Sequence, residues 1–307
     1  MLVENTVQEW YDAKHATSSI FEIEFINSLD IKQCPFCGSN DFIKYSHKKD
    51  GTQRYICKEC GKHFTALMNT IFDSKKTPIF EWIEYLLHLF EFHSINSTAY
   101  DNRNSPTTGK YWLIKTFEVL KGIQDDVVLD GTVYLDETYF TKVRSKLVTK
   151  DGKKLRGISR NKIGVGVACN ETKSIFIVTG TSKPSRKSTI ETYGKHIARG
   201  SVLVHDDELS HSILIEELEL ESKVYPTKVT KGLSDKDNPL YPVNNLHLLL
   251  KQFIRNHGAY VREHPQEWLS LFWFIMNEPK DMYKLTSGHI SLFQMSLKIL
   301  FIFMHSS

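Results

Sequence analysis

The sequence has no long apolar run. Its longest, Leu271–Met276 and Ile299–Met304, are far too short to span a bilayer. The opening MLVENTVQEW carries an acid at Glu4 and lacks the basic-then-apolar pattern of a secretory signal. There is also no internal repeat and no low-complexity tract. These absences, with an aromatic content of 12%, predict an ordinary globular protein of the cytoplasm.

Cysteine is scarce and unevenly placed. Of the five cysteines, four form two close pairs and the fifth, Cys169, lies in an apolar run. Such a layout excludes a disulfide framework and is more typical of metal binding. The two pairs are CPFC, with Cys34 and Cys37, and CKEC, with Cys57 and Cys60, nineteen residues apart.

This spacing predicts a zinc ribbon. Two thiolates three positions apart chelate one ion from a tight turn, and two such turns complete a tetrahedral shell. Gly38 and Gly61 directly follow the two pairs, where the chain must turn with little steric room. Tyr55 and Phe64 can pack a hairpin too small to be stable without metal. A redox or merely structural role is the weaker alternative for four thiols in a glycine-rich, basic segment.

Net charge is low, but basic residues cluster locally. A formal charge of +3 does not by itself indicate a nucleic-acid partner. From Lys142 to Lys162, however, nine lysines or arginines accompany a single acid, Asp151. This stretch predicts a basic hairpin on a DNA backbone, because each phosphate contact releases counterions. The ribbon is basic as well, although solvated charge explains any one of its lysines equally well.

The spacing of apolar residues divides the chain into a helical N-terminal part and a later part with the pattern of strands. Residues 1–30 read as a helical lead-in. Apolar residues at three- and four-residue spacing predict helix from Pro78 to Leu120, interrupted by a polar break over Ser94–Lys110. The pattern is compatible with a helix-turn-helix unit, as with any small helical bundle.

From Gly131 the period becomes that of strands. The predicted strands are Thr132–Phe140, Lys162–Ala168, Ser174–Gly180, Ser201–His205 and Val224–Tyr225. The predicted helices are Ser185–Arg199, Ser210–Leu218, 244–256 and 265–277. Three sequential strands followed by alternating helices and strands predict a mixed sheet covered by helices.

Two acids occupy strands that are otherwise apolar. Asp136 lies within VYLDETYF, and Asp206 ends the short strand SVLVH. A buried carboxylate is costly without a partner, and a divalent cation such as Mg²⁺ is a suitable one. Asp206 has an alternative role as a cap of the following helix. Glu137 points to the opposite face by the two-residue period and is the weaker candidate.

A third ligand is expected from the helix that follows two prolines. Asn244, His247 and Lys251 lie on one helical stripe. An amide oxygen or an imidazole can bind a metal, and Lys251 can hold a phosphate nearby. Asn244 or Asn245 can equally be the N-cap of this helix. The residues alone leave Asn244 and His247 open as third ligand.

Taken together, these motifs resemble the zinc-ribbon group of bacterial insertion-sequence transposases. The matching segments are CPFCGS with CKECGKHF; the Trp82 helix with TTGKYWLIK; YLDETYF; KKLRGISRNKIGVGVAC; VLVHDDELSH; and NPLYPVNNLHLLLKQFIRNHGAY with EWLSLFWFIMN. These segments follow one another in the same order as in that group, and together they run through most of the chain.

The resemblance implies an α/β chain whose ribonuclease-H-like mixed sheet is flanked by helices. It is preceded by a zinc ribbon and a helical, helix-turn-helix-like module. The expected segments are a lead-in at 1–30, a ribbon at 31–68, a helical DNA-binding module at 76–124 and a catalytic domain at 130–307.

The resemblance further implies catalytic Asp136, Asp206 and Asn244 holding Mg²⁺ or Mn²⁺, with Lys251 as the helix lysine. Many relatives carry Glu at the third position, where this chain has Asn244, so His247 stays the alternative. The implied activity is metal-dependent cleavage and strand transfer of an insertion sequence, at its terminal inverted repeats and target DNA. A homodimer on DNA in the bacterial nucleoid is expected.

Two other functions remain open. The absent Glu is compatible with a zinc-ribbon DNA-binding regulator that carries an inactive catalytic domain. A ribonuclease-H-like nuclease that cuts without strand transfer would use the same ligands.

Overall fold

The computed structural model of the chain describes residues 22–70, 72–75, 77–102, 104–141, 151–152, 157–158, 162–181, 183–257 and 264–277. Most of the predicted basic stretch Lys142–Lys162, and the predicted lead-in up to residue 21, lie outside these ranges. The chain forms two compact units; the first ends at Val119 and the second begins at Leu120. Within the described ranges, no helix is both long enough and apolar enough to cross a membrane.

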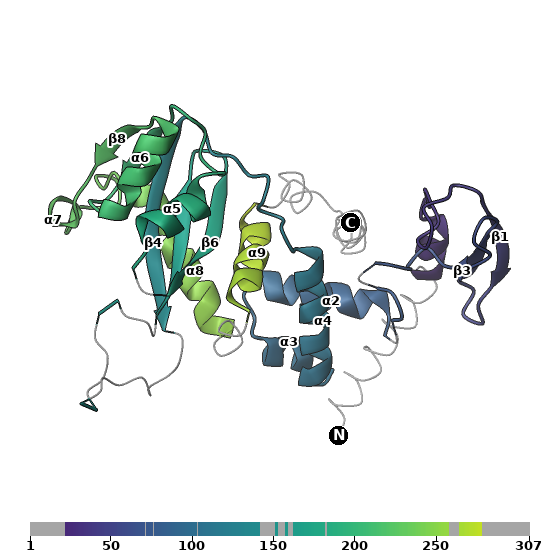
Figure 1. Cartoon of the computed structure of the whole chain (residues 1–307). Helices are drawn as coiled ribbons and strands as arrows, with labels where there is room; N and C mark the ends of the chain where they lie inside the picture. The colour runs from purple at the N-terminus through teal and green to yellow at the C-terminus, as the bar shows by residue number, and fades with distance from the viewer. Residues whose placement is uncertain are drawn as a thin grey trace, which may run out of the picture. The chain divides into compact units, whose positions relative to one another are not determined.

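The first unit contains a small three-stranded antiparallel sheet. Its strands, in the order β1-β2-β3, are β1 (Phe42–His47), β2 (Gln53–Cys57) and β3 (His63–Phe64) (Figure 1). Tyr55 and Phe64 stack with ring centroids 5.6 Å apart, and Phe42 meets Phe64 edge-on at 5.4 Å. The rings of Tyr55 and Phe64 form the buried core of the sheet with Cys34 and Cys57, as the sequence predicted for the two aromatic residues, and Ile31, Phe42, Cys60 and Met68 pack against them.

The same unit contains three helices in its second half. They are α2 (Ile79–Phe90), α3 (Ile95–Asp101) and α4 (Pro106–Val119). Trp82 of α2 packs on Trp112 of α4 with centroids 4.7 Å apart. The hydroxyl of Tyr85 donates to the carbonyl oxygen of Gly109 at 2.6 Å, where a side chain would crowd the Tyr85 ring.

The polar break predicted over Ser94–Lys110 is wrong, because α3 and the start of α4 occupy it. Ser94 caps α3 by accepting a hydrogen bond from the Ser97 amide at 3.1 Å. The helix spans only seven residues and buries three of them, so its apolar face is too short to produce a visible period.

The second unit is built on a five-stranded mixed sheet. Its strands are β4 (Thr132–Thr141), β5 (Lys162–Cys169), β6 (Ser174–Thr181), β7 (Val202–His205) and β8 (Glu221–Val224). Their order is β6-β5-β4-β7-β8; β4, β5 and β6 are antiparallel neighbours, whereas β7 and β8 run parallel to β4. Three antiparallel strands continued by two parallel ones make the sheet ribonuclease-H-like, so the predicted fold class is confirmed.

Helices flank this sheet (Figure 1). They are α5 (Arg186–Tyr193), a 3₁₀ turn η1 (Leu209–His211), α6 (Ser212–Leu218), α7 (Thr227–Thr230), α8 (Tyr241–His257) and α9 (Pro265–Met276). A buried apolar cluster joins β4 and β7 to α5 and α6. Helix α8 packs on β4 and β5, and α9 packs on β6. The helix predicted over Ser185–Arg199 is shorter than expected, because after Tyr193 the chain turns and pairs Ile197 with Leu129.

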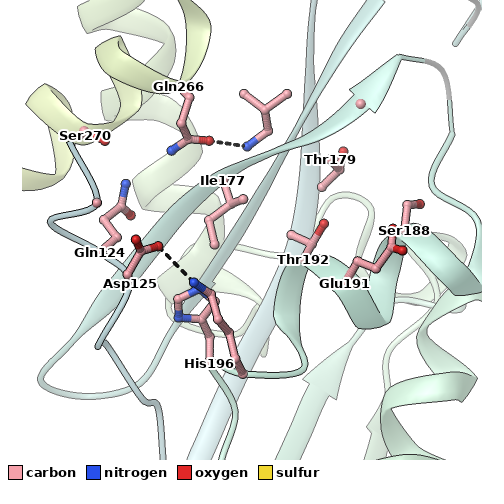
Figure 2. Close-up of a pocket in the computed structure, with 14 residues that line it drawn as sticks. Gln124, Asp125, Ile177, Thr179, Ser188, Glu191, Thr192, His196, Gln266 and Ser270 are labelled. Carbon is pink, nitrogen blue, oxygen red and sulfur yellow. Dashed lines mark hydrogen bonds and ion pairs between the residues drawn. The ribbon is translucent and has the colours of Figure 1, made fainter. Parts of the chain in front are cut away.

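Two glutamine side chains cover the outer edge of β6. The amide of Gln124 donates to the carbonyl oxygen of Phe176 at 3.1 Å and accepts from its N–H at 2.7 Å. Gln266 of α9 accepts from the N–H of Val178 at 2.9 Å, as Figure 2 shows. An open strand edge is a template for pairing with another chain. Side-chain amides therefore take the place of a sixth strand here.

Candidate active site and metal centres

The four paired cysteines come together at one end of the small sheet. Their sulfur atoms all lie within 4.8 Å of one another. Sγ of Cys34 is 3.8 Å from that of Cys60, and Sγ of Cys37 is 3.6 Å from that of Cys57. A tetrahedral zinc–thiolate shell with bonds of about 2.3 Å separates its sulfurs by about 3.8 Å. The cluster therefore has the dimensions of a structural zinc site and could bind zinc.

The backbone explains this geometry through two matching turns. The N–H of Gly38 donates to the carbonyl oxygen of Cys34 at 2.9 Å, and that of Gly61 donates to that of Cys57 at 3.0 Å. Both glycines have positive φ, 75° and 66°. This backbone conformation favours glycine because it lacks a Cβ. The glycines noted in the sequence thus allow each turn to present its two thiols to the same point.

The two predicted aspartates lie side by side on neighbouring parallel strands. In the register of β4 with β7, Leu135 pairs with His205, so Asp136 and Asp206 each follow a paired residue. Oδ1 of Asp136 accepts from the N–H of Glu137 at 2.8 Å. Oδ1 of Asp206 accepts from the N–H of Glu208 at 3.0 Å. Asp206 thus stabilises its own turn, and it does not cap α6, whose N-cap is His211.

The charges of these carboxyl groups are coupled. Burial, with the added negative charge of Asp206, raises the pKa of Asp136 to about 7. Burial also raises the pKa of Asp206 above its ordinary value. Two carboxyl groups whose charged forms are disfavoured by burial fit a bound divalent cation, which would stabilise both anions.

Helix α8 brings the third candidates to the same face of β4. Nδ1 of His247 lies 3.8 Å from Oδ2 of Asp136. Burial, with the nearby charge of Lys251, lowers the pKa of His247 to about 4, so the imidazole is neutral at neutral pH. Its Nε2 is buried and has no hydrogen-bond partner among the described residues. A neutral imidazole with a free nitrogen can act as a ligand.

Asn244 lies one turn before His247 and is partly buried. Because α8 begins at Tyr241, neither Asn244 nor Asn245 is its N-cap, so that alternative is wrong. The N–H of Asn244 donates within the helix to Leu240. Lys251 follows on the same stripe and is exposed. Of the three residues on this stripe of α8, His247 lies close to Asp136, and Asn244 and Lys251 lie one turn before and one turn after it.

Behind Asp136, on the opposite face of β4, Glu137 is the anchor of a buried polar network. Its side chain is only 4% exposed. The hydroxyl of Tyr193 donates to Oε1 of Glu137 at 2.8 Å, and Nε2 of His211 lies 3.3 Å from both carboxylate oxygens. Nδ1 of His211 lies 3.1 Å from Nδ1 of His205, whose Nε2 lies 3.1 Å from Oγ of Ser222.

This network is satisfied in either charge state of its central histidine. When His211 is neutral, Ser222 donates to His205, His205 donates to His211, and His211 donates to Glu137. When His211 is protonated, its Nδ1–H donates to His205 and His205 donates to Ser222. Burial disfavours the cation, but the hydrogen bond and charge of Glu137 outweigh it and raise the pKa of His211 above its ordinary value.

The network also reaches the second predicted aspartate, because Nδ1 of His211 lies 3.8 Å from Oδ1 of Asp206. The sequence analysis missed His205, His211 and Tyr193, and it ranked Glu137 low. The signal was present in VHDDELSH, where two histidines flank the acids at a spacing of six. Recognising it required the contact between β4 and the η1 turn, which the sequence does not provide.

This unit also has a hollow that lies away from the aspartates. A cavity of about 590 Å³ is lined by residues of β6, α5 and α9, among them Thr179, Glu191 and Gln266 (Figure 2). An ion pair of 2.9 Å between Lys195 and Asp125 lies beside it. None of the predicted ligands lines this cavity, so it is not part of the candidate active site.

No protein-family model and no curated protein sequence matches the chain. Among solved structures, a pre-cleavage Mos1 transpososome aligns at a TM-score of 0.28 and 14% identity, covering 76% of this chain and 79% of that chain. The Mos1 strand transfer complex aligns at 0.28 and 15% identity, covering 76% and 78%. A simian T-cell lymphotropic virus intasome in complex with PP2A regulatory subunit B56 gamma aligns at 0.31 and 10% identity, covering 64% and 68%. Likeness at these scores carries no conclusion about this chain's activity.

Proposed function

We propose that this chain is a DNA transposase of the zinc-ribbon insertion-sequence group, which cleaves transposon ends and joins them to target DNA. The observation that carries the proposal is that Asp136 and Asp206 directly follow the paired residues Leu135 and His205 of the parallel strands β4 and β7, and that burial disfavours the anion of both. A divalent cation would stabilise both anions. Carboxylate oxygens with an amide or imidazole are the donors that Mg²⁺ or Mn²⁺ accepts.

In this proposal Asp136 and Asp206 hold the catalytic metal, and Asn244 or His247 completes the set. The bound cations would supply activation of the attacking oxygen and stabilisation of the leaving oxygen of the phosphodiester. His211 orients Asp206, and the backbone N–H of Glu137 orients Asp136. Lys251, one turn beyond His247, lies where it can hold a DNA phosphate.

The remaining parts of the chain would bind the DNA. We assign the recognition of terminal inverted repeats to the zinc ribbon and the α2–α4 helices. The basic stretch Lys142–Lys162 would contact the DNA backbone. Transposition joins two ends in one reaction, so we propose a homodimer on DNA.

The test separates metal binding from catalysis. Binding of Mn²⁺ is followed by electron paramagnetic resonance for the unmodified chain, Asp136→Asn and Asp206→Asn, with Asp207→Asn as matched control. Asp207 is exposed and adjacent to Asp206, but it has no assigned role. We expect Mn²⁺ binding to be lost in the first two variants and kept in the control. Full Mn²⁺ binding by both site variants would contradict the site.

The same proteins are then incubated with duplexes that carry the DNA flanking the gene, together with a supercoiled target plasmid and Mg²⁺. We expect the unmodified chain to cut and integrate the labelled ends, and Asp136→Asn to bind them without cutting. Salt-sensitive binding with no cutting by the unmodified chain would identify a regulator. Cutting with no integrated product would identify a nuclease.

A further inference from the structure

A second group of metal-ligating side chains lies in the helical part of the first unit, on elements that carry none of the ligands assigned to the ribbon or to the candidate active site. His88 is in the last turn of α2, His93 is in the connection to α3, and Asp101 is the last residue of α3. One ligand atom from each lies within 4.8 Å of the others.

The three side chains converge on one carboxylate oxygen. Nδ1 of His88 lies 3.7 Å from Oδ2 of Asp101, and Nδ1 of His93 lies 3.9 Å from the same atom. Both distances are too long for a hydrogen bond. Both Nδ1 atoms are shielded from solvent, and neither has a hydrogen-bond partner among the described residues. The Nδ1 atoms of both histidines therefore face the same oxygen of Asp101, which also lies 3.5 Å from the hydroxyl of Ser97.

The backbone conformation of the turn between α2 and α3 brings the two histidines together. Phe92 has a φ of 65°, which is uncommon for a residue with a side chain. That conformation lets the N–H of His93 donate back to the carbonyl oxygen of His88 at 2.9 Å. The two imidazole rings thus lie 5.2 Å apart by their centroids. The cap at Ser94 then starts α3 at once, and its last turn returns Asp101 to the histidines.

We propose that His88, His93 and Asp101 bind one divalent transition-metal ion, most suitably zinc. Zinc bonds of about 2.0–2.1 Å in a tetrahedral shell separate neighbouring ligand atoms by about 3.4 Å. The observed 3.7 and 3.9 Å need only a few tenths of an ångström of contraction. Two imidazoles and a carboxylate leave a fourth position for water, a donor set that zinc accepts and Mg²⁺ does not favour.

A carboxylate behind one of the ligands supports this orientation. Oε2 of Glu91 lies 3.9 Å from Nε2 of His93, the nitrogen that points away from Asp101. At this distance Glu91 makes no hydrogen bond to His93, and it would support the site through its negative charge, which stabilises a metal-bound imidazole. Ion pairing alone explains the cluster less well, because a single Asp101 oxygen would face two imidazolium groups.

The ion would fix the angle between α2 and α3. His88 and Asp101 belong to two helices that are joined only by a short turn, so a bond through metal ties their ends. Because the ion binds the folded helices and not the unfolded chain, its free energy of binding adds to their stability.

The experiment uses cobalt, which reports the two kinds of site separately. The metal-free full chain is titrated with Co²⁺ under reducing conditions. Thiolate-to-cobalt charge-transfer absorption reports the four cysteines, and the visible ligand-field absorption reports all bound cobalt. Bound zinc is counted in parallel by equilibrium dialysis and mass spectrometry. The variants are His93→Gln, Asp101→Asn and Glu91→Gln. The control is His264→Gln, because His264 also lies near a carboxylate, 3.7 Å from Glu267, and belongs to a different helix terminus.

We expect the unmodified chain and His264→Gln to bind one equivalent of zinc at His88, His93 and Asp101 in addition to the equivalent in the ribbon, and we expect His93→Gln and Asp101→Asn to lack this second equivalent. The charge-transfer absorption should be equal in all of them, which shows that the variants are folded in the ribbon. Glu91→Gln should weaken the second equivalent about 10-fold, as loss of a supporting carboxylate does elsewhere. Equal zinc counts in the unmodified chain, His93→Gln and Asp101→Asn would overturn the proposal. Neither readout depends on DNA cleavage.

Discussion

The hydroxyl of Tyr193 reaches Glu137 only because residue 166 is glycine. In the register of β4 with β5, Glu137 pairs with Gly166. A Cβ at position 166 would lie 2.0 Å from the Tyr193 oxygen and 2.6 Å from Cζ of the same ring. The Tyr193 ring therefore lies directly on the backbone of β5, and its hydroxyl donates to the carboxylate on the adjacent strand at 2.8 Å.

Gly166→Ala should therefore be strongly destabilising. The added methyl group displaces a fully buried ring, an overpacking that typically costs about 1–3 kcal/mol. Tyr193→Phe, which removes one hydrogen bond and no volume, should cost about 1 kcal/mol. Urea unfolding gives both values, and the double variant should cost less than their sum because the two residues are in contact. Equal stability of Gly166→Ala and the unmodified chain would contradict this packing.

Removing His211 should cost more than removing the tyrosine hydroxyl. His211 is fully buried, and its Nε2 contacts the buried carboxylate of Glu137, which raises the pKa of this histidine above its ordinary value. His211→Ala leaves that carboxylate without this partner, and loss of one member of a buried pair costs about 3–5 kcal/mol. Adding Glu137→Gln to His211→Ala should recover part of this free energy of unfolding. No recovery in the double variant would show that the two side chains are not coupled.

His257 should make the second unit sensitive to acid. Burial lowers its pKa from 6.5 to about 4, and neither ring nitrogen has a hydrogen-bond partner among the described residues. The folded chain thus binds this proton more weakly than the unfolded chain. The free energy of unfolding then decreases as the pH falls from about 6.5 towards 4, by up to about 1.4 kcal/mol per pH unit.

His257→Leu keeps the volume and removes the titrating group. Between pH 7 and pH 5, the stability of this variant relative to the unmodified chain should rise by about 2 kcal/mol. Urea unfolding at both pH values measures the change. A difference that is independent of pH would show that His257 is not held neutral in the fold.

Cys37→Ser should unfold the zinc ribbon. One ligand of the four is lost, and a sheet with so few core residues is not stable without its ion. Bound zinc should fall by one equivalent, and the thiolate charge-transfer absorption of the cobalt form should be lost. Cys169→Ala is the matched control, because Cys169 is buried in β5 outside the cluster and should leave both signals unchanged.

The third catalytic ligand can be decided by comparing two neighbouring positions of α8. If Asn244 completes the proposed site, Asn244→Ala should abolish Mn²⁺-dependent DNA cutting and Asn244→Glu should retain it. If His247 does so, His247→Ala should abolish cutting while Asn244→Ala has little effect. Leu248→Ala is the control, because Leu248 is 65% exposed on the same helix. Unchanged cutting in both alanine variants would exclude both residues.

Local rules in the sequence accounted for the ribbon and for most strands. The four cysteines with Gly38 and Gly61 define the zinc geometry within about thirty residues, because each turn is fixed by its own backbone. The bounds predicted for β4 to β7 were close because β-branched and apolar runs are local signals, whereas the strand predicted over Val224–Tyr225 shares only Val224 with β8, which is exposed along its length. The short α3 was missed, since seven residues with three buried ones carry too little periodic signal.

The sequence determined by itself which residues can do chemistry: the cysteine pairs, and two acids on apolar strands. Only the tertiary structure decided which groups surround them. It paired β4 with β7 in the register that sets Asp136 beside Asp206, and it placed His247 on one side of β4 and the Glu137–His211 network on the other. The reason is physical: these contacts join residues 70 to 111 positions apart, and chain folding, rather than local spacing, sets their distances.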